Sequence, residues 1–273
     1  MHLTTDAAPA LRSTVAAAPV PAAHHGAVPD AAAVEVDSEN APEGIVMPKI
    51  PGLPGRGDSG ISLGKLLAPP KPGSVADRAD MAFVKGAQKL RTAKGDAWAD
   101  TMARTGAFQA WMTFARQHRA TSGTVRGWLD TALLGTVLAA TAAVTQIAKS
   151  KYDRPRPFQV DPSIKPPVQL PRSASYPSGH SSSAFAGARV IARVAPELAG
   201  DAYKLATQVA ASRVYAGVHY PTDVVMGALL GTGVADAILN AVHRGHSLRD
   251  AAAQVVRDAR NGAFDAAAGA AAA

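Results

Sequence analysis

The central part of the chain carries a helical pattern of apolar and polar positions. Alternating runs of β-branched residues, which would indicate strands, are scarce. Alanine is abundant and aromatic residues make up only 5% of the chain, so local preference also favours helix. The pattern predicts helices over residues 74–91, 96–117, 122–149, 179–193, 197–214, 222–243 and 246–260. We therefore expect an all-α protein, a compact helical bundle.

The start of the first predicted helix is marked by Ser74, whose hydroxyl suits an N-cap. Asp77 and Asp80 follow near the start of this helix, where negative charge suits the positive end of the helix dipole. We interpret both carboxylates as residues that stabilise the start of the helix.

The two ends of the chain lack the helical pattern. Residues 1–64 are rich in alanine, proline, glycine and acidic residues, a composition that cannot bury enough apolar surface to become ordered. Residues 262–273 are a low-complexity tail. We predict a disordered N-terminal arm over 1–64, one helical domain over 65–261 and a tail over 262–273.

Charge and hydropathy narrow the classes of partner. The formal net charge of +7 favours phosphorylated small molecules, nucleic acid or an acidic membrane surface. The stretch 131–148 is uncharged and nearly long enough to span a bilayer, but threonine, glycine and alanine dilute it and it stands almost alone. We interpret it as a buried core helix and expect a protein that is not an integral membrane protein.

A long loop between the helices ending near residue 149 and starting near residue 178 is rich in proline. Structureless loops of this length within a compact domain are usually functional or disordered. Proline stiffens the backbone, which favours a functional loop. The prolines concerned are Pro155, Pro157, Pro162, Pro166, Pro167 and Pro171.

The first two groups of candidate functional residues flank this loop. Lys149 closes an apolar helix and Arg156 lies in the loop, so an ammonium and a planar guanidinium would suit a tetrahedral oxyanion. Ser178, Gly179 and His180 open the next helix, where the dipole favours an anion. Taken alone, the first group also fits a solvated basic loop, and the second fits simple helix capping.

The third group lies in the link between two later helices. Arg213 ends one helix, His219 lies in the link, and Asp223 falls in the first turn of the next helix. A hydrogen bond from the imidazole to this carboxylate would set the tautomer and leave the other ring nitrogen free as a nucleophile. A single His and Asp at this spacing are more often structural.

Together the three groups supply two imidazoles, three cations and an orienting carboxylate. This inventory fits phosphoryl transfer through a phosphohistidine, in which cationic side chains neutralise the phosphoryl oxygens. No metal ion or other cofactor is then required. The chain also has no cysteine, which excludes disulfides and thiolate metal sites.

The three groups, in this order and spacing, resemble the signature of the phosphatidic acid phosphatase type 2 superfamily. The stretch "LLAPPKPGSVADRAD" is similar to the entry of the bacterial class A non-specific acid phosphatases, so the resemblance covers roughly residues 65–245. The resemblance implies a helical bundle of the acid phosphatase and vanadium haloperoxidase type. The N-terminal arm and the C-terminal tail fall outside it.

The resemblance also implies a role for each candidate residue. His219 would be the nucleophile, Asp223 its orienting partner, and His180 the acid that protonates the leaving group. The remaining residues would bind phosphate: Lys149, Arg156, Ser178, Gly179 and Arg213. The expected function is a metal-independent acid phosphatase that hydrolyses phosphate monoesters of small molecules.

Several alternatives stay open. Within the same superfamily these are a lipid-phosphate or pyrophosphate phosphatase and, ranked lower, a vanadium haloperoxidase. A basic helical protein that binds nucleic acid or membrane would explain the charge but not the three spacings, and we expect no nucleic-acid partner. A homo-oligomer is compatible with the sequence. The family suggests periplasmic or secreted residence, but the N-terminus has no evident Sec signal, so cytoplasmic residence or a specialised export system is the alternative.

Overall fold

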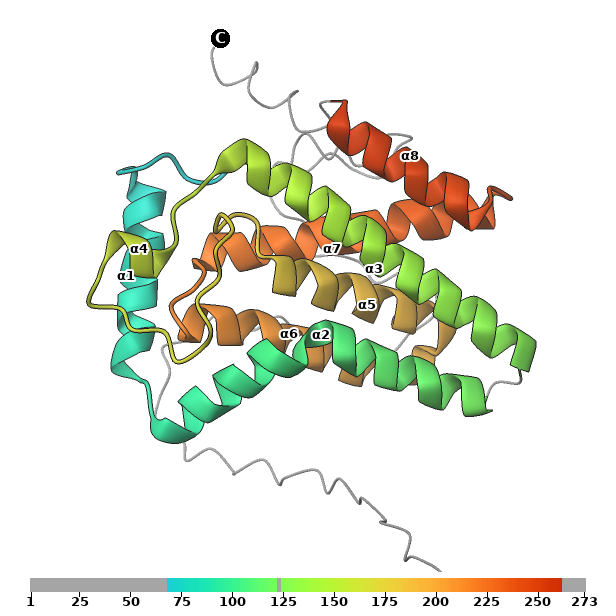
Figure 1. Cartoon of the computed structure of the whole chain (residues 1–273), viewed down its shortest axis with the longest axis horizontal. Helices are drawn as coiled ribbons and strands as arrows, with labels where there is room; N and C mark the ends of the chain where they lie inside the picture. The colour runs from blue at the N-terminus through green and yellow to red at the C-terminus, as the bar shows by residue number, and fades with distance from the viewer. Residues whose placement is uncertain (1–67, 122–123, 262–273) are drawn as a thin grey trace, which may run out of the picture. The chain divides into compact units, whose positions relative to one another are not determined.

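The computed structural model describes residues 68–121 and 124–261, which lie within one compact unit, Arg56–Ala273 (Figure 1). These residues form helices and no strand, which confirms the all-α prediction. The helices are α1 Val75–Lys89, α2 Ala93–Thr121, α3 Thr124–Tyr152, α4 Pro157–Val160, α5 Gly179–Val194, α6 Ala199–Tyr215, α7 Pro221–His243 and α8 Leu248–Arg260, with a 3-10 turn, η2 Pro196–Leu198. The predicted disordered arm and C-terminal tail lie outside the described residues, and the domain boundaries stay predictions.

The seven predicted helices are present, and their ends differ from the prediction by a few residues. Ser74 is the N-cap of α1, and its Oγ accepts a hydrogen bond from the Asp77 backbone at 3.2 Å. The four-residue helix α4 was not predicted. It begins with Pro157 at its first position, and the Gln159 side chain accepts a hydrogen bond from the Arg156 backbone at 2.7 Å.

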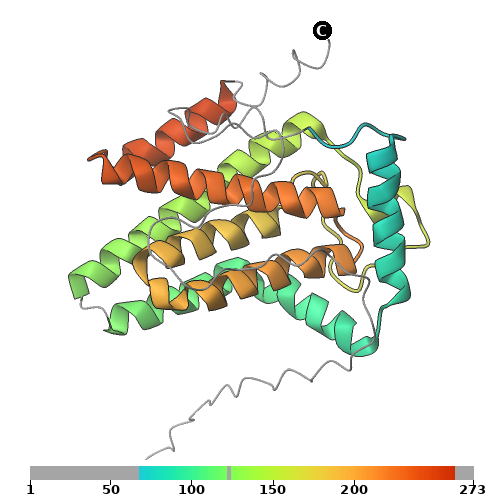
Figure 2. The same cartoon turned by 180° about the vertical axis from the view of Figure 1, so that it is seen from behind.

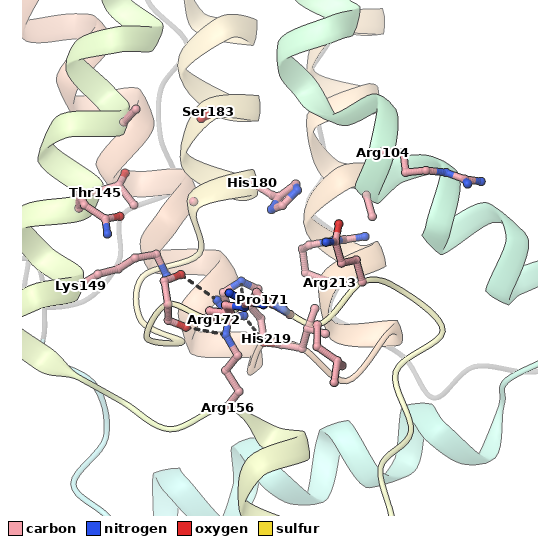
Figure 3. Close-up of a pocket in the computed structure, with 18 of the residues that line it drawn as sticks. Arg104, Thr145, Lys149, Arg156, Pro171, Arg172, His180, Ser183, Arg213 and His219 are labelled. Atoms are coloured by element: carbon pink, nitrogen blue, oxygen red, sulfur yellow. Dashed lines mark hydrogen bonds between the residues drawn. The ribbon is translucent and has the colours of Figure 1, made fainter.

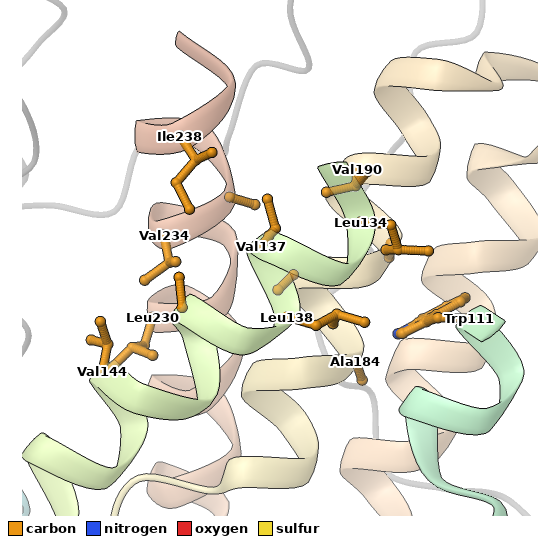
Figure 4. Packing of buried hydrophobic residues seen from close by; sticks show 14 of the residues in the cluster. Trp111, Leu134, Val137, Leu138, Val144, Ala184, Val190, Leu230, Val234 and Ile238 are labelled. Atoms are coloured by element: carbon orange, nitrogen blue, oxygen red, sulfur yellow. The ribbon is translucent and has the colours of Figure 1, made fainter. Parts of the chain in front are cut away.

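Helix α5 lies at the centre of the bundle and packs against α3, α6 and α7 (Figures 1 and 2). The apolar stripes of these helices, together with buried residues of α2 and α8, form one continuous core (Figure 4). Burying each of its larger aliphatic side chains contributes about 1.5–3 kcal/mol relative to leaving it exposed. The labelled core residues are Trp111, Leu134, Val137, Leu138, Val144, Ala184, Val190, Leu230, Val234 and Ile238.

The backbones of α5 and α7 approach closely because two glycines of α7 face the start of α5. A Cβ on Gly227 would lie 2.5 Å from the Ser178 carbonyl oxygen, and one on Gly231 would overlap the Ser182 backbone. The Ser178 backbone N–H donates to the Asp223 carbonyl at 2.9 Å. This close packing places the N-terminus of α5 directly beside the N-terminus of α7.

The proline-rich loop between α3 and α5 folds back over the end of α3. The Ser175 backbone N–H donates to the Arg154 carbonyl at 2.8 Å, which pairs the two ends of the loop. Ile164 and Val168 of the loop are buried in two small apolar clusters under α1, α2 and α6. The loop is therefore held against the bundle at both its ends and its middle.

Candidate active site

A cavity of about 1460 Å³ opens where the end of α3, the start of α5, the end of α6 and the proline-rich loop meet (Figure 3). Six of the eight predicted site residues line it: Lys149, Arg156, Gly179, His180, Arg213 and His219. The other two, Ser178 and Asp223, are fully buried behind the cavity wall. The tertiary structure thus brings residues from four separate segments to one place.

The imidazole of His219 is held between a carboxylate and a guanidinium. Its Nδ1 lies 3.3 Å from Oδ2 of Asp223, and its Nε2 lies 3.1 Å from Nη1 of Arg156. A guanidinium can only donate hydrogen bonds, so Nε2 must be the acceptor and Nδ1 must carry the proton. The lone pair of Nε2 therefore faces the cationic wall of the cavity, as a nucleophile toward an anion requires.

Asp223 is held in place by a network that leaves its carboxylate few other orientations. Its Oδ2 accepts from the Ser175 hydroxyl at 2.5 Å and from the Tyr220 backbone at 2.9 Å. The Ser175 hydroxyl also lies 3.5 Å from Nδ1 of His219. Sequence reasoning missed Ser175, because its only signal is a position two residues before Pro177 in a loop.

The Arg156 guanidinium is fixed by backbone carbonyls of the loop. Its Nε donates to the Ser173 carbonyl at 2.8 Å, and its Nη1 donates to the Val218 carbonyl at 2.7 Å. The side chain is only 2% exposed, so its charge acts in a region of low dielectric constant. Buried cations of fixed orientation are suited to binding an oxyanion.

The two other predicted cations approach the cavity from different helices. Lys149 Nζ donates to the Ala174 and Ser175 carbonyls, which ties the end of α3 to the loop. Arg213 Nη2 donates to the Ala99 carbonyl of α2 at 2.9 Å. Desolvation, followed by the positive charge of Arg156, lowers the pKa of Arg213 to about 10, so it stays a cation at neutral pH.

The three predicted residues at the start of α5 do not all reach the cavity. Ser178 Oγ accepts from the Ser181 backbone at 3.4 Å, so its side chain is an N-cap and does not line the cavity. Gly179 and His180 do line the cavity. Desolvation, followed by the charge of Arg213, lowers the pKa of His180 to about 4, although its ring opens onto the cavity. Desolvation also lowers the pKa of the fully buried His219 to about 3, which keeps this ring neutral.

Arg154, which sequence reasoning did not single out, binds three carboxylates at once. Its Nη1 lies 2.8 Å from Asp223 Oδ1, and its Nη2 lies 2.9 Å from Asp80 Oδ2 and 3.0 Å from Asp77 Oδ1. The guanidinium also stacks 3.8 Å from the ring centroid of Tyr220. Helix α1 is thereby connected through one buried side chain to the carboxylate that orients His219.

The interpretation of Asp80 as a residue that stabilises the helix start is wrong. Its carboxylate is 4% exposed and binds Arg154 and the Thr222 backbone and hydroxyl, the last two at 3.2 and 2.5 Å. A buried carboxylate of this kind needs charged or hydrogen-bonding partners. Helical spacing places it on the inner face of α1 but does not reveal those partners, which lie more than 70 residues away along the chain.

The sequence pattern of the PAP2 superfamily matches residues 130–246. Decaprenylphosphoryl-5-phosphoribose phosphatase of Mycobacterium tuberculosis is 36% identical over 138 residues, which cover 44% of this chain and 73% of that protein. The chain belongs to the PAP2 superfamily. A second relative, the non-specific acid phosphatase of Providencia stuartii, is 33% identical over 93 residues, or 33% of this chain and 38% of that protein. The predicted family and the phosphatase class are confirmed.

Two solved structures share the fold of this chain with a TM-score of 0.50 or more. A bacterial vanadium-dependent iodoperoxidase superposes with a TM-score of 0.55 at 19% identity over 65% of this chain and 53% of that chain. LpxE of Aquifex aeolicus gives a TM-score of 0.50 at 20% identity over 57% and 91%. A transmembrane PAP2 type phosphatidylglycerolphosphate phosphatase of Bacillus subtilis gives 0.49 at 24% identity over 64% and 90%.

The prediction that this is not an integral membrane protein is wrong. Two helical segments, Val125–Val160 and Pro221–His243, are long and apolar enough to cross a membrane, and only 44% and 39% of their most apolar stretches are buried. A relative is named for a decaprenyl-linked substrate. The second segment was overlooked because Asp223 and Asp236 interrupt it. In the structure Asp223 binds Arg154 and Asp236 binds Arg189 at 2.5 Å.

Proposed function

We propose that this PAP2 protein hydrolyses phosphate monoesters through a phosphohistidine on Nε2 of His219. The observation that carries the proposal is the position of this nitrogen, deprotonated and directed at Arg156 on a cavity wall lined by further cations. Nε2 would attack phosphorus, forming an N–P bond as the P–O bond to the leaving group breaks. His180 would give its proton to the departing oxygen, then take one from the water that cleaves the N–P bond.

The three cations would bind the non-bridging oxygens of the phosphoryl group. Lys149, Arg156 and Arg213 reach the cavity from α3, the loop and α6, so they surround a bound phosphate from different directions. Their charges would stabilise the negative charge of the pentacoordinate transition state, the role that metal ions have in many other phosphatases. Turnover would then need no divalent cation.

The Arg156–His219 contact would keep the lone pair of His219 Nε2 occupied until substrate arrives. In the free protein, Arg156 Nη1 donates to the lone pair of Nε2. A bound phosphate dianion is a stronger acceptor for the guanidinium, so it would withdraw this donor and release the lone pair for attack. Asp223 would stabilise the positive charge that develops on the ring.

For the substrate, we propose a lipid-linked phosphate monoester. The relative matched over most of its length is named for a decaprenyl-linked phosphoribose, and two helices of this chain are apolar enough to lie in a membrane. Met112, Ala142 and Leu170 add apolar surface to the cavity beyond the cations. A soluble phosphate monoester is the second candidate, which the acid phosphatase relative favours.

Hydrolysis by the full chain in detergent micelles would test both substrate classes. We expect the protein to release inorganic phosphate. This activity should persist in excess EDTA and should be inhibited by vanadate, which mimics the pentacoordinate phosphorus. A polyprenyl-linked sugar phosphate should be hydrolysed with higher kcat/KM than glycerol phosphate or nitrophenyl phosphate. Loss of activity on chelation, restored by a divalent ion, would contradict the mechanism, whereas a preference for the soluble esters would contradict only the substrate class.

A further inference from the structure

Thr145 of α3 carries a hydroxyl that has no hydrogen-bond partner. Within the part of the chain that the structure describes, its Oγ1 is the single buried side-chain nitrogen or oxygen without one. The residue is 4% exposed and lines the cavity. A buried polar group left without a partner destabilises the folded protein, so the presence of this hydroxyl calls for a reason outside folding.

Neighbouring threonines show that the helix itself offers a partner. In several helices a threonine hydroxyl donates to the carbonyl four residues earlier, at 2.7–2.9 Å. On α3 one turn before Thr145, Thr141 does so to the Val137 carbonyl at 2.8 Å. Thr145 does not use this arrangement, and threonine in a helix has two accessible rotamers for the purpose. Its hydroxyl is therefore not bonded to the helix.

The position of Thr145 relative to the two histidines indicates what the hydroxyl meets. Thr145 lies one turn before Lys149, and its Cγ2 is 3.7 Å from the point where a Cβ on Gly179 would lie. It is thus beside the residue that precedes His180. In Figure 3, Thr145 lies level with His180, Ser183 lies above them, and His219 and Arg156 lie below, so Thr145 and His180 are at the same end of the cavity.

Phosphoryl transfer places the attacking and the leaving atoms on opposite sides of phosphorus. On the proposed function, with His219 as nucleophile and His180 as acid, the side that holds Thr145 is the side of the leaving group. We propose that the Thr145 hydroxyl binds the leaving group, through a hydrogen bond to an oxygen on the carbon next to the ester carbon. The inference rests on the proposed function and names its leaving-group class: alcohols with a vicinal oxygen, such as glycerol or a pentose, rather than simple alkyl alcohols.

Two esters that differ in this oxygen test the proposal, glycerol 3-phosphate and propyl phosphate. We expect the wild-type protein to favour glycerol 3-phosphate in kcat/KM. T145V, which is nearly isosteric, should lower kcat/KM for glycerol 3-phosphate by about 3- to 10-fold, the effect of one neutral hydrogen bond, and leave propyl phosphate unchanged. T145S, which keeps the hydroxyl, should retain the preference.

T141V is the matched control, since it makes the same substitution one turn away at a hydroxyl that is bonded to the helix. It should leave the ratio of the two kcat/KM values unchanged and lower the melting temperature, whereas T145V should melt at or above the wild-type temperature. The inhibition constant of vanadate should be the same in T145V and wild type, because the phosphate-binding residues are intact.

The outcomes distinguish a failure of the leaving-group role of Thr145 from a failure of the proposed phosphatase function. Equal losses on both esters in T145V, an unchanged ratio, a weaker inhibition by vanadate or a lower melting temperature would each overturn the leaving-group role. A wild-type protein without preference between the esters would overturn it as well. A wild-type protein that hydrolyses neither these esters nor a lipid-linked one would instead overturn the proposed function on which the inference rests.

Discussion

Nη1 of Arg156 lies 3.1 Å from Nε2 of His219, so a permanent hydrogen-bond donor faces the proposed nucleophile. The same guanidinium is held by the Val218 and Ser173 carbonyls. The position of one cation therefore sets the tautomer of the histidine and, in the same contact, marks where a phosphoryl oxygen would bind.

Substitutions of His219 and of Asp223 should lower kcat to different extents, because the first is the proposed nucleophile and the second is the carboxylate that orients it. H219A should abolish turnover, because no N–P bond can form. D223N should lower kcat by about 10²- to 10⁴-fold, because an amide can donate to Nδ1 and favour the wrong tautomer. D236N, on the same helix but in a partly exposed pair with Arg189, should retain wild-type kcat. Radiolabelled phosphate on H219A after a rapid quench would contradict the assignment.

Replacing Arg154 should reduce both stability and activity, because it leaves buried carboxylates without a counter-charge. R154M should lower the free energy of unfolding by about 3–5 kcal/mol. R104A, which breaks an exposed ion pair with Asp100, should cost about 0–1 kcal/mol.

Adding D80N to R154M should recover part of the lost stability, since it removes one of the unpaired charges. Chemical denaturation of the four proteins measures these differences. If R154M is no less stable than R104A, Arg154 does not connect α1 to the site in the way described.

The pH profile should be bell-shaped, with its two limbs assigned to the two histidines. Desolvation lowers the pKa of His219 to about 3, so protonation of the nucleophile lowers kcat/KM only in strong acid. Desolvation and the charge of Arg213 lower the pKa of His180 to about 4, so the acid form of His180 is lost above this pH in the free protein. The kcat profile should lie at higher pH, because a bound phosphate dianion raises both pKa values.

H180N should lose the alkaline limb and retain most activity on nitrophenyl phosphate, whose phenolate leaves without a proton. Its activity on alkyl phosphates should fall by about 10²-fold or more. Stopped assays with both esters over a pH range measure this. An unchanged alkaline limb in H180N would show that another group titrates.

The glycine contact between α7 and α5 should be sensitive to a single methyl group. G231A should destabilise the protein by about 1–3 kcal/mol, because its Cβ would overlap the Ser182 backbone and push apart the helix starts that carry Ser178 and Asp223. G135A in α3, where a Cβ would meet nothing within 4 Å, should be neutral or stabilising by about 0.4–1 kcal/mol. Thermal unfolding of both variants decides the matter, and equal melting temperatures would contradict the close packing.

The helices and most of the cavity residues could be predicted from the sequence, because their signals are local. Periodicity and the Ser74 N-cap located α1, and the three spaced groups around Lys149, His180 and His219 located the residues that line the cavity. These signals depend on backbone propensity and on residue type within a few positions. They need no knowledge of which helix packs against which.

Only the tertiary structure decided which side chains that are distant in sequence become partners. Arg154 finds Asp80 and Asp223, the Ser178 side chain turns into the helix cap, and Thr145 keeps its hydroxyl unpaired beside the cavity. The sequence does not show which way a charged or hydroxyl side chain points. The role of such a group depends on its hydrogen-bond partners and on how far packing buries it. The packing of α5 against α7 sets those surroundings, through glycines whose importance appears only when the two backbones meet.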